Sequence, residues 1–456
     1  MSGSRLTTLD ASFLELESSS AHMHVGWAAR FAAPAGERRP RFDELREHVA
    51  GRMGRAPRYR QKLATVPLSL HDPVWVDDGD FSVDRHVRRG ECGDLGALVD
   101  DVMSEQLGRD RPLWELWIAD DLDDGSIGVI GKAHHAMVDG IAAVELASLL
   151  VDATRECAPP EPDGWLPARA PDAVSLMADA VADRAGQIAG LARWPLELTR
   201  HPKRLAAVAG GAVPSARALA DSLRPSTPRT CLNEPISARR HLARARRPLA
   251  DLKQIKNGFG ATVNDVVLAS VAGAMRAFFE ERGDAPVPLK TMVPVSVRPP
   301  NGAGELGNRI SFVFVDLPCQ EPDPVLRIAW VMDDMGRRKR EGRPEAADNV
   351  LRALGFAPRP LQNALSHMVA SPRAFNLTVS NIPGPPQPLY MLGCELEEVY
   401  PVVPITDRHA LSIGMTTLRD EAFFGIYAGC DALPDADRIG ELLGESVDEL
   451  LDLAAA

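Results

Sequence analysis

The sequence predicts an α/β protein with two domains of similar size, joined by a helical crossover. The chain has 456 residues, more than one hydrophobic core usually holds. Strand-like and helix-like segments alternate on both sides of a stretch at 156–172 that is rich in Pro and polar residues. Ala-rich helical spacing follows at 173–223. We therefore place the domains at 1–155 and 236–456, with the linker and crossover helices at 156–235.

The first domain is expected to alternate strands with amphipathic helices. In chain order its elements are a strand at 27–31, helices at 42–53 and 97–107, a hairpin of 116–119 and 127–130 that turns at 123–125, and a helix at 141–151. Asp139 and Gly140 stand where the last helix needs an N-cap and a first turn.

Residue spacing and proline positions also predict the elements of the crossover and of the second domain. In the crossover, Pro195, Pro202 and Pro214 predict breaks between three short helices, whose apolar faces pack on the protein or, alternatively, on lipid. The second domain is expected to contain helices at 264–281 and 323–340 and strands at 290–297, 310–317, 377–379 and 412–417.

Charge and cysteine usage exclude several classes of protein. The net charge is −12, and the runs RRKR at 337–340 and RARRP at 244–248 are short enough to be solvated faces, so we expect no nucleic-acid partner. The 6 cysteines are scattered without a CxxC pair, which favours reduced thiols and no metal site. Neither a signal peptide nor a long apolar run is present, so we expect a cytoplasmic protein.

The run HHAMVDG at 134–140 carries the chemistry. On a strand, neighbouring side chains point to opposite faces, so His134 and His135 cannot both reach one reacting atom unless the strand ends between them. One histidine should then be structural and the other should face a cleft. Adjacent strand residues also chelate a metal poorly, and no third ligand has zinc spacing. From this motif alone, two structural histidines are the alternative.

A histidine that titrates near neutral pH is a natural base for a hydroxyl proton. Asp139 either bonds the imidazole, as in a triad, or holds the loop through an arginine; we favour the second role, with Arg298 as the partner. Gly140 would let the helix start lie close to the substrate or to the other domain. GxSxG is absent and no cysteine has a reactive context, which favours direct attack by the acceptor without an acyl-enzyme.

The HHxxxDG run resembles the motif of the CoA-dependent acyltransferase superfamily. Further segments resemble the bacterial wax ester synthase/diacylglycerol acyltransferase family: LDASFL (9–14), MHVG (23–26), PRYRQKL (57–63), DRPLWE (110–115), TVNDVVLA (262–269), VPVSVR (293–298), LGNRIS (306–311) and NLTVSNIPGP (376–385). The similarity runs in order along nearly the whole chain, and the set is specific although each segment besides HHxxxDG is weak alone.

This resemblance implies two chloramphenicol-acetyltransferase-like domains, each a mixed β-sheet with helices, and a tunnel between them. It implies that His135 is the general base and that Asp139 is structural. Acyl-CoA would be a substrate, with no further cofactor, and a long-chain alcohol or diacylglycerol would accept the acyl group.

Other segments have a structural and a functional interpretation. Asn264 and Asp265 open a helix, where capping is the simple role; near the catalytic centre the Asn264 amide could bond the thioester oxygen or order the His135 loop. Thr378, Ser380 and Asn381 offer oxyanion donors at a strand end. We rank Asn264 first and Ser380 and Asn381 second. In the segment DRPLW, the expected framework residues are Pro112, Leu113 and Trp114.

The sequence leaves four questions open. A same-fold acyltransferase could act on a sterol, sugar or polyketide hydroxyl, because freely varying tunnel residues choose the acceptor. An inactive lipid-binding member is a second alternative, against which the intact HHxxxDG argues. Monomer and homodimer are equally compatible, and peripheral contact with the inner membrane or a lipid droplet is an open partner interaction.

Overall fold

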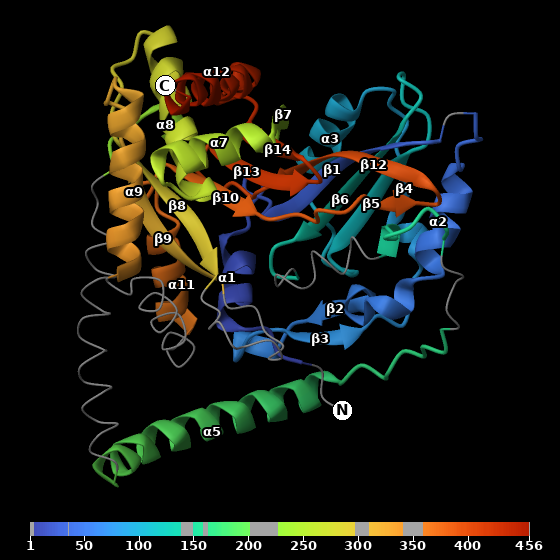
Figure 1. The fold of residues 1–456 in the computed structure, drawn as a ribbon. Coiled ribbons are helices and arrows are strands. Elements are labelled where there is room, and N and C mark those ends of the chain that lie inside the picture. The colour runs from blue at the N-terminus through green and yellow to red at the C-terminus, as the bar shows by residue number, and fades with distance from the viewer. Residues whose placement is uncertain are drawn as a thin grey trace.

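Two mixed sheets form the framework of the computed structural model, which describes residues 4–34, 36–137, 149–157, 163–200, 227–296, 310–340 and 359–455 (Figure 1). The first sheet has the order β11-β12-β1-β6-β5-β4 and the second β7-β14-β13-β10-β8-β9. The α/β fold class is therefore confirmed.

The strands of the first sheet are β1 (His24–Ala32), β4 (Val87–Arg89), β5 (Trp114–Ala119), β6 (Ile127–His134), β11 (Tyr390–Met391) and β12 (Cys394–Val402). Those of the second are β7 (Arg240–Pro248), β8 (Leu289–Ser296), β9 (Ile310–Leu317), β10 (Leu377–Ile382), β13 (Leu411–Leu418) and β14 (Glu421–Gly429). β2 (Gln61–Ala64) and β3 (Val74–Asp77) pair separately.

The helices are α1 (Thr8–Leu16), α2 (Phe42–Ala50), α3 (Leu95–Ser104), α5 (Ala173–Arg200), α7 (Leu249–Phe259), α8 (Val263–Glu281), α9 (Pro324–Arg340), α11 (Arg359–Val369) and α12 (Ala436–Ala454). Short 3-10 turns occur at η1 (Met53–Arg55), η2 (Pro57–Arg60), η3 (Pro67–Ser69), η4 (Val83–Arg85) and η5 (Cys231–Asn233). Helices α7, α8, α9 and α12 pack together beside the second sheet, as Figure 1 shows.

β12 joins the two sheets, although it comes from late in the chain. It pairs antiparallel with β1, with Gly26 opposite Val402. Its end also crosses β13 and β14 so closely that a Cβ on Gly425 would lie 2.0 Å from the Pro401 carbonyl oxygen. Only glycine allows that approach. The sheet of the first half therefore includes two strands from 390–402, and the predicted domain boundaries at 155 and 235 stay a prediction.

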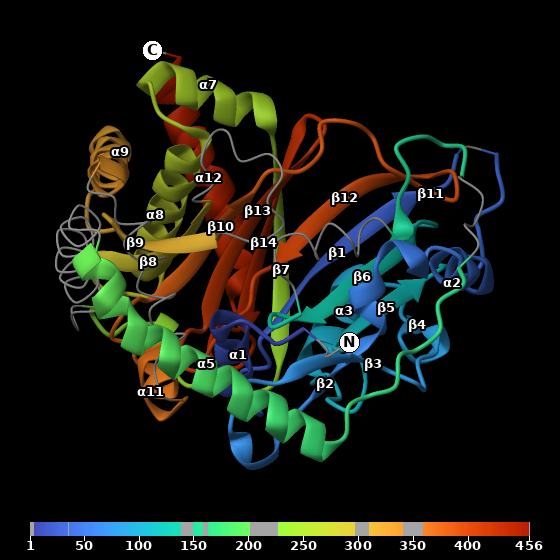
Figure 2. The ribbon, with the colours of Figure 1, turned by 90° about the horizontal axis from the view of Figure 1, so that it is seen from below.

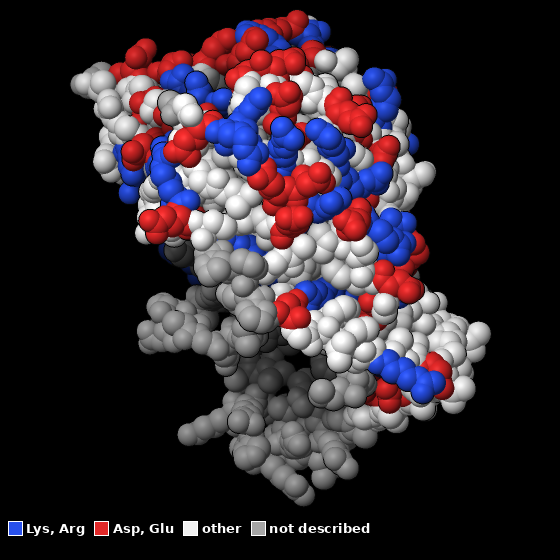
Figure 3. Space-filling model, turned by 90° about the vertical axis from the view of Figure 1, so that its right-hand side faces the viewer, with Lys and Arg blue, Asp and Glu red and all other residues white. Residues whose placement is uncertain are grey.

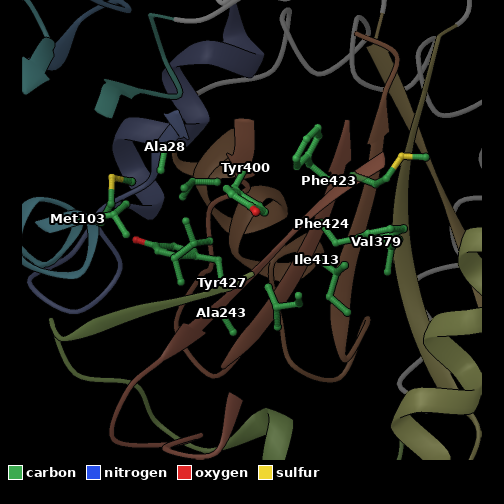
Figure 4. Packing of buried hydrophobic residues seen from close by; sticks show 14 of the residues in the cluster. Ala28, Met103, Ala243, Val379, Tyr400, Ile413, Phe423, Phe424 and Tyr427 are labelled. Atoms are coloured by element: carbon green, nitrogen blue, oxygen red, sulfur yellow. The ribbon is translucent and has the colours of Figure 1, made fainter. Parts of the chain in front are cut away.

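One continuous hydrophobic core extends across both sheets. Figure 4 follows it from Ala28 on β1 and Met103 on α3, through Tyr400 on β12, to Ile413 on β13 and Val379 on β10. Because burial of this apolar surface spans the junction, the two halves stabilise each other.

The predicted elements agree with the structure except in the crossover. α5 is one helix from Ala173 to Arg200, so the predicted break at Pro195 is wrong. Proline is disfavoured inside a helix but only bends or weakens it when the flanking turns hold. Pro202 and Pro214 lie outside the described residues, as does most of the predicted helix at 141–151, of which residues 149 and 150 are helical.

Candidate active site

The two histidines lie where β6 ends. β6 is buried along its whole length and stops at His134. The backbone N–H of His135 donates to the carbonyl oxygen of Met23 at 2.9 Å, which holds the chain just beyond the strand. The strand therefore ends between the two histidines, so strand alternation does not by itself place their rings on opposite faces, and the contacts of each ring decide its role.

The imidazole of His134 is held in the fold. It is 1% exposed, and the N–H of Ala136 donates to its Nδ1 at 3.0 Å. A neutral ring that accepts at Nδ1 carries its proton on Nε2, which lies 3.7 Å from Oε2 of Glu17. Burial lowers the pKa of His134 to about 3, so this ring is neutral and structural.

His135 is in a different state. Its ring is half-buried, and its Nδ1 is buried without a hydrogen-bond partner in the described part of the chain. Burial lowers the pKa of His135 to about 4, against a smaller opposing effect from its own backbone carbonyl. At neutral pH the imidazole is therefore uncharged and can accept a proton.

The phenyl ring of Phe13 on α1 stacks on the His135 imidazole, with ring centroids 3.8 Å apart and planes inclined by 23°. The sequence interpretation did not identify Phe13 or Glu17 as site residues. Phe13 lies in LDASFL, a segment that resembles the family, but no pattern of neighbouring residues indicates that residue 13 contacts residue 135. Three of the predicted site residues, Asp139, Gly140 and Arg298, lie outside the described residues.

At the start of α8, Thr262 caps the helix, so capping does not account for Asn264. Thr262 is the N-cap: its hydroxyl accepts from the Asp265 N–H at 3.2 Å, and the Asp265 carboxylate accepts from the Thr262 N–H at 2.9 Å. This capping box satisfies the first turn without Asn264. Asp265 is therefore a cap residue, while the half-buried Asn264 amide makes no hydrogen bond with the described residues.

Thr378 and Ser380 lie on one face of β10, and Asn381 lies on the other, because side chains alternate along a strand. The hydroxyl-bearing residues are 7% and 6% exposed. Ser380 pairs in register with Gly414 of β13, onto which Val403 packs directly after β12.

The register thus brings parts of both halves to one junction. β6, β1 and β12 are consecutive strands of the first sheet, and the end of β12 lies at the same edge as His134. β12 then contacts β13, the neighbour of β10. The predicted groups on β6 and β10 therefore approach this junction from opposite sheets.

Pro112, Leu113 and Trp114 form part of the framework of the first sheet. All three are buried, and the indole N–H of Trp114 donates to the Tyr59 carbonyl oxygen at 2.7 Å. The ring of Trp114 also stacks on His86 at 4.7 Å between centroids. These contacts explain the residues through packing, as predicted for a structural role.

A His–Asp–Cys group occurs away from this junction. His48, Asp152 and Cys157 place one ligand atom each within 4.8 Å of one another. The guanidinium of Arg52 contacts both the Asp152 carboxylate, at 2.5 Å, and the Cys157 sulfur, at 3.4 Å. A cation already balances the carboxylate, so we interpret the group as a polar network that fastens residues 152–157 to α2.

The surface charges are mixed. On the face in Figure 3, Lys and Arg side chains alternate with Asp and Glu instead of forming a patch of one sign. Many charged side chains of the described residues are paired, for example Arg39 with Asp121 at 2.7 Å and Arg89 with Asp120 at 3.1 Å. Among the described helices none is by itself long and apolar enough to cross a membrane; α7 and α8 meet that condition only together, bent by 99°.

Comparisons with known proteins agree along the whole chain. A family model described as the wax ester synthase/diacylglycerol acyltransferase catalytic domain matches residues 6–267, and the model of the C-terminal domain of that family matches residues 306–451. A probable diacylglycerol O-acyltransferase of Mycobacterium tuberculosis is 31% identical over 462 residues, covering 98% of this chain and 96% of the relative. A second one from the same organism is 32% identical over 458 residues, covering 97% of each.

Solved structures give the same result for the fold. The wax ester synthase/diacylglycerol acyltransferase from Marinobacter aquaeolei VT8 has a TM-score of 0.70 at 26% identity, covering 99% of this chain and 100% of that chain. The first condensation domain of the calcium-dependent antibiotic synthetase has a TM-score of 0.59 at 14% identity, covering 100% and 97%, a likeness of fold alone. These matches confirm the predicted two-domain acyltransferase-like fold.

Proposed function

The chain belongs to the wax ester synthase/diacylglycerol acyltransferase family and is an acyl-CoA-dependent O-acyltransferase, and from that premise we propose that it transfers a long-chain acyl group to diacylglycerol with His135 as general base. The acceptor is chosen from the relatives, two of which are named as diacylglycerol O-acyltransferases. A long-chain alcohol is the second acceptor, because the family name covers both.

The reaction needs a single proton carrier. The acceptor hydroxyl gives its proton to the neutral His135 as its oxygen attacks the thioester carbon, and a C–O bond forms. The carbonyl electrons move onto oxygen, then return as the C–S bond breaks and the CoA sulfur leaves. His135 returns its proton to that thiolate, so the product is an ester and free CoA.

The state of His135 is the observation that carries this role. A half-buried imidazole with a lowered pKa is uncharged at neutral pH, and it lies just beyond a buried strand. When the oxyanion forms, its negative charge stabilises the imidazolium and offsets the cost of burying that cation. The position of His135 in the family's HHxxxDG motif also supports its role as the general base.

The thiols support attack without an acyl-enzyme. Burial raises the pKa of Cys319 to about 12, and burial also raises the pKa of Cys157, Cys231 and Cys394. A protonated thiol is a weak nucleophile. We therefore route no step through these cysteines. For the oxyanion, we propose Asn264 first and Ser380 or Asn381 second, with Asp139 and Arg298 as a structural pair.

We also propose that the protein contacts a lipid surface from outside. Apolar side chains are exposed at η3, in the extended stretch before α5 and in the first half of α5: Leu68 (84%), Leu70 (40%), Leu166 (84%), Val174 (76%) and Val181 (59%). Figure 2 shows α5 crossing the near side of the molecule. With a net charge of −12, attachment should depend on apolar burial more than on anionic lipid.

The lipid contact is tested by flotation with zwitterionic vesicles that contain diacylglycerol. The double variant Leu68→Ser, Leu166→Ser should lose most of its vesicle-bound fraction. Leu453→Ser is the matched control, since Leu453 is 41% exposed on α12. Equal binding by the double variant and wild type would refute the contact.

The transferase proposal is tested by thiol release from palmitoyl-CoA with diacylglycerol, with hexadecanol or with no acceptor. Wild type should release CoA only when an acceptor is present. His135→Ala should lose about 10²–10⁴-fold in rate, the usual contribution of general base catalysis, while its Tm and acyl-CoA binding stay near wild type. A variant that keeps more than about a tenth of the rate would refute the base assignment. Release that does not depend on an acceptor would refute transfer.

A further inference from the structure

One helix contacts both histidines of the HHAMVDG run. Phe13 on α1 stacks on His135, and Glu17, the C-cap residue of α1, lies 3.7 Å from Nε2 of His134. Residues four apart share one face of a helix. The face of α1 that carries positions 13 and 17 is therefore the face turned toward the end of β6.

The end of α1 is anchored by charge. The Glu17 side chain is 2% exposed, and its carboxylate accepts from Nε of Arg109 at 2.9 Å and from Nε2 of Gln106 at 2.8 Å. Arg109 also donates to the Leu14 carbonyl oxygen at 3.2 Å. A buried carboxylate with this many donors fixes its chain segment, because moving it would leave a desolvated charge unpaired.

The rest of α1 is held as well. Thr7 caps the helix by accepting from the Asp10 N–H at 3.1 Å. Near the other end, Asn363 on α11 donates to the Glu15 carboxylate at 3.1 Å. Figure 1 shows α1 in the region between the two sheets. The position of the Phe13 ring is thus set by contacts from both halves of the protein.

The stacked ring matters because His135 must become a cation during the proposed reaction. Burial disfavours that cation, as the lowered pKa of His135 shows. The negative face of an aromatic ring attracts a cation, and the attraction is strongest where water is excluded. A phenyl ring 3.8 Å away also limits rotation of the imidazole about its side-chain bond.

We propose that Phe13 is a positioning residue of the transferase: it holds the His135 imidazole in its reactive orientation and stabilises the imidazolium that forms in the transition state. This inference rests on the proposed function of His135. It differs from simple core packing, because a leucine of similar size would fill the space but supply no aromatic face.

The test compares Phe13→Leu with Phe13→Tyr in the palmitoyl-CoA assay. Phe13→Leu should lower kcat about 10- to 30-fold, the effect of a desolvated cation–π contact, with KM for palmitoyl-CoA unchanged. Phe13→Tyr keeps the aromatic face and should stay within about threefold of wild type. The matched control is Phe81→Leu, since Phe81 stacks on the structural His86 with centroids 5.3 Å apart; it should keep the wild-type kcat.

A second readout follows the contact itself. In protein labelled at histidine, the His135 ring proton should be shifted upfield by the stacked phenyl ring, and Phe13→Leu should abolish that shift while Phe13→Tyr retains it. A wild-type kcat in Phe13→Leu, or equal losses in the Leu and Tyr variants, would overturn the proposal. An active His135→Ala would instead overturn the proposed function, so the two failures are distinguishable.

Discussion

Two histidines in different halves of the molecule have nearly the same immediate surroundings. His135 stacks on Phe13 with centroids 3.8 Å apart, and His409 stacks on Phe375 with centroids 4.0 Å apart and planes inclined by 28°. Burial lowers the pKa of each to about 4. By stacking and by pKa alone, neither would be preferred as a catalytic base.

The difference lies in exposure and in hydrogen bonding. His409 is 2% exposed, and its Nδ1 is bonded to the Thr406 hydroxyl at 2.8 Å and the Asp407 carbonyl oxygen at 3.1 Å. Those bonds fasten the turn before β13. The ring of His135 is half-buried, and its Nδ1 has no partner among the described residues. A lowered pKa therefore reports burial, whereas partial exposure of an unbonded ring distinguishes a candidate base from a structural histidine.

We expect the largest effect when His135 and His409 are replaced in turn and the activities of the two variants are compared. His135→Gln should lose about 10²–10⁴-fold in kcat, because the proton acceptor is removed. His409→Gln should keep kcat within about threefold but lower the free energy of unfolding by about 1–3 kcal/mol, since a buried hydrogen-bonded group is changed. The measurements are kcat at saturating palmitoyl-CoA and urea unfolding. A collapse of kcat in a folded His409→Gln would contradict the comparison.

A second contrast applies to the start of α8. Asn264→Ala should lower kcat by about 10²–10³-fold if its amide stabilises the oxyanion, with Tm unchanged because Thr262 and Asp265 form the cap. Thr262→Ala should cost about 1 kcal/mol of stability through loss of that cap, with kcat near wild type. If Asn264→Ala lowered Tm and left kcat intact, Asn264 would be a structural residue.

The two rings should respond alike in the acid dependence of stability. An unfolded histidine binds a proton near pH 6.5, but the folded rings bind it only near pH 4. Their contribution to stability is therefore complete above pH 6.5 and is lost as the pH falls toward 4. Replacing either histidine should reduce the slope of unfolding free energy against pH by up to about 1.4 kcal/mol per pH unit in that window. If the slope of unfolding free energy against pH differed between the His135 and His409 variants, the two rings would not be equivalent in their acid response.

The pKa of a third histidine, His241, is shifted in the opposite direction, and we expect its replacement to change the stability of the protein less. Hydrogen bonds to Asp100 on α3, at 2.7 Å, and to Asp437, at 3.1 Å, raise its pKa to about 9. This protonated ring links the two halves, and its contribution is complete below pH 6.5 and lost as the pH rises through 9.

His241→Gln should lower stability by about 1 kcal/mol at pH 6, because partly exposed ion pairs contribute little, and it should not differ from wild type above pH 10. Thermal unfolding at both pH values measures this, with Arg239→Gln as a control for a fully surface pair. A difference that persists at pH 10 would show that packing, not charge, links the halves.

The local elements could be predicted from the chain. Short apolar or alternating segments placed β1, β5, β6, β8, β9, β10 and β13, and helical spacing placed α2, α3, α8 and α9, because these patterns are local consequences of which faces are buried. Several elements were not predicted, among them the strands β7, β12 and β14 and the helices α1, α7 and α12. Charged residues interrupt β7, and β12 follows a Pro-rich turn, so neither shows a clean period of two.

The sequence by itself determined the family and the two mixed α/β halves, since motif and order are properties of neighbouring residues, and through the family resemblance it led to the proposal of His135 as the base. Only the tertiary structure decided that β12 crosses into the first sheet, that α1 lays Phe13 on His135, and that Thr262 rather than Asn264 caps α8. The physical reason is distance along the chain. Contacts between residues 13 and 135, or 26 and 402, depend on how the whole core packs, and no local pattern encodes which distant face will cover a given side chain.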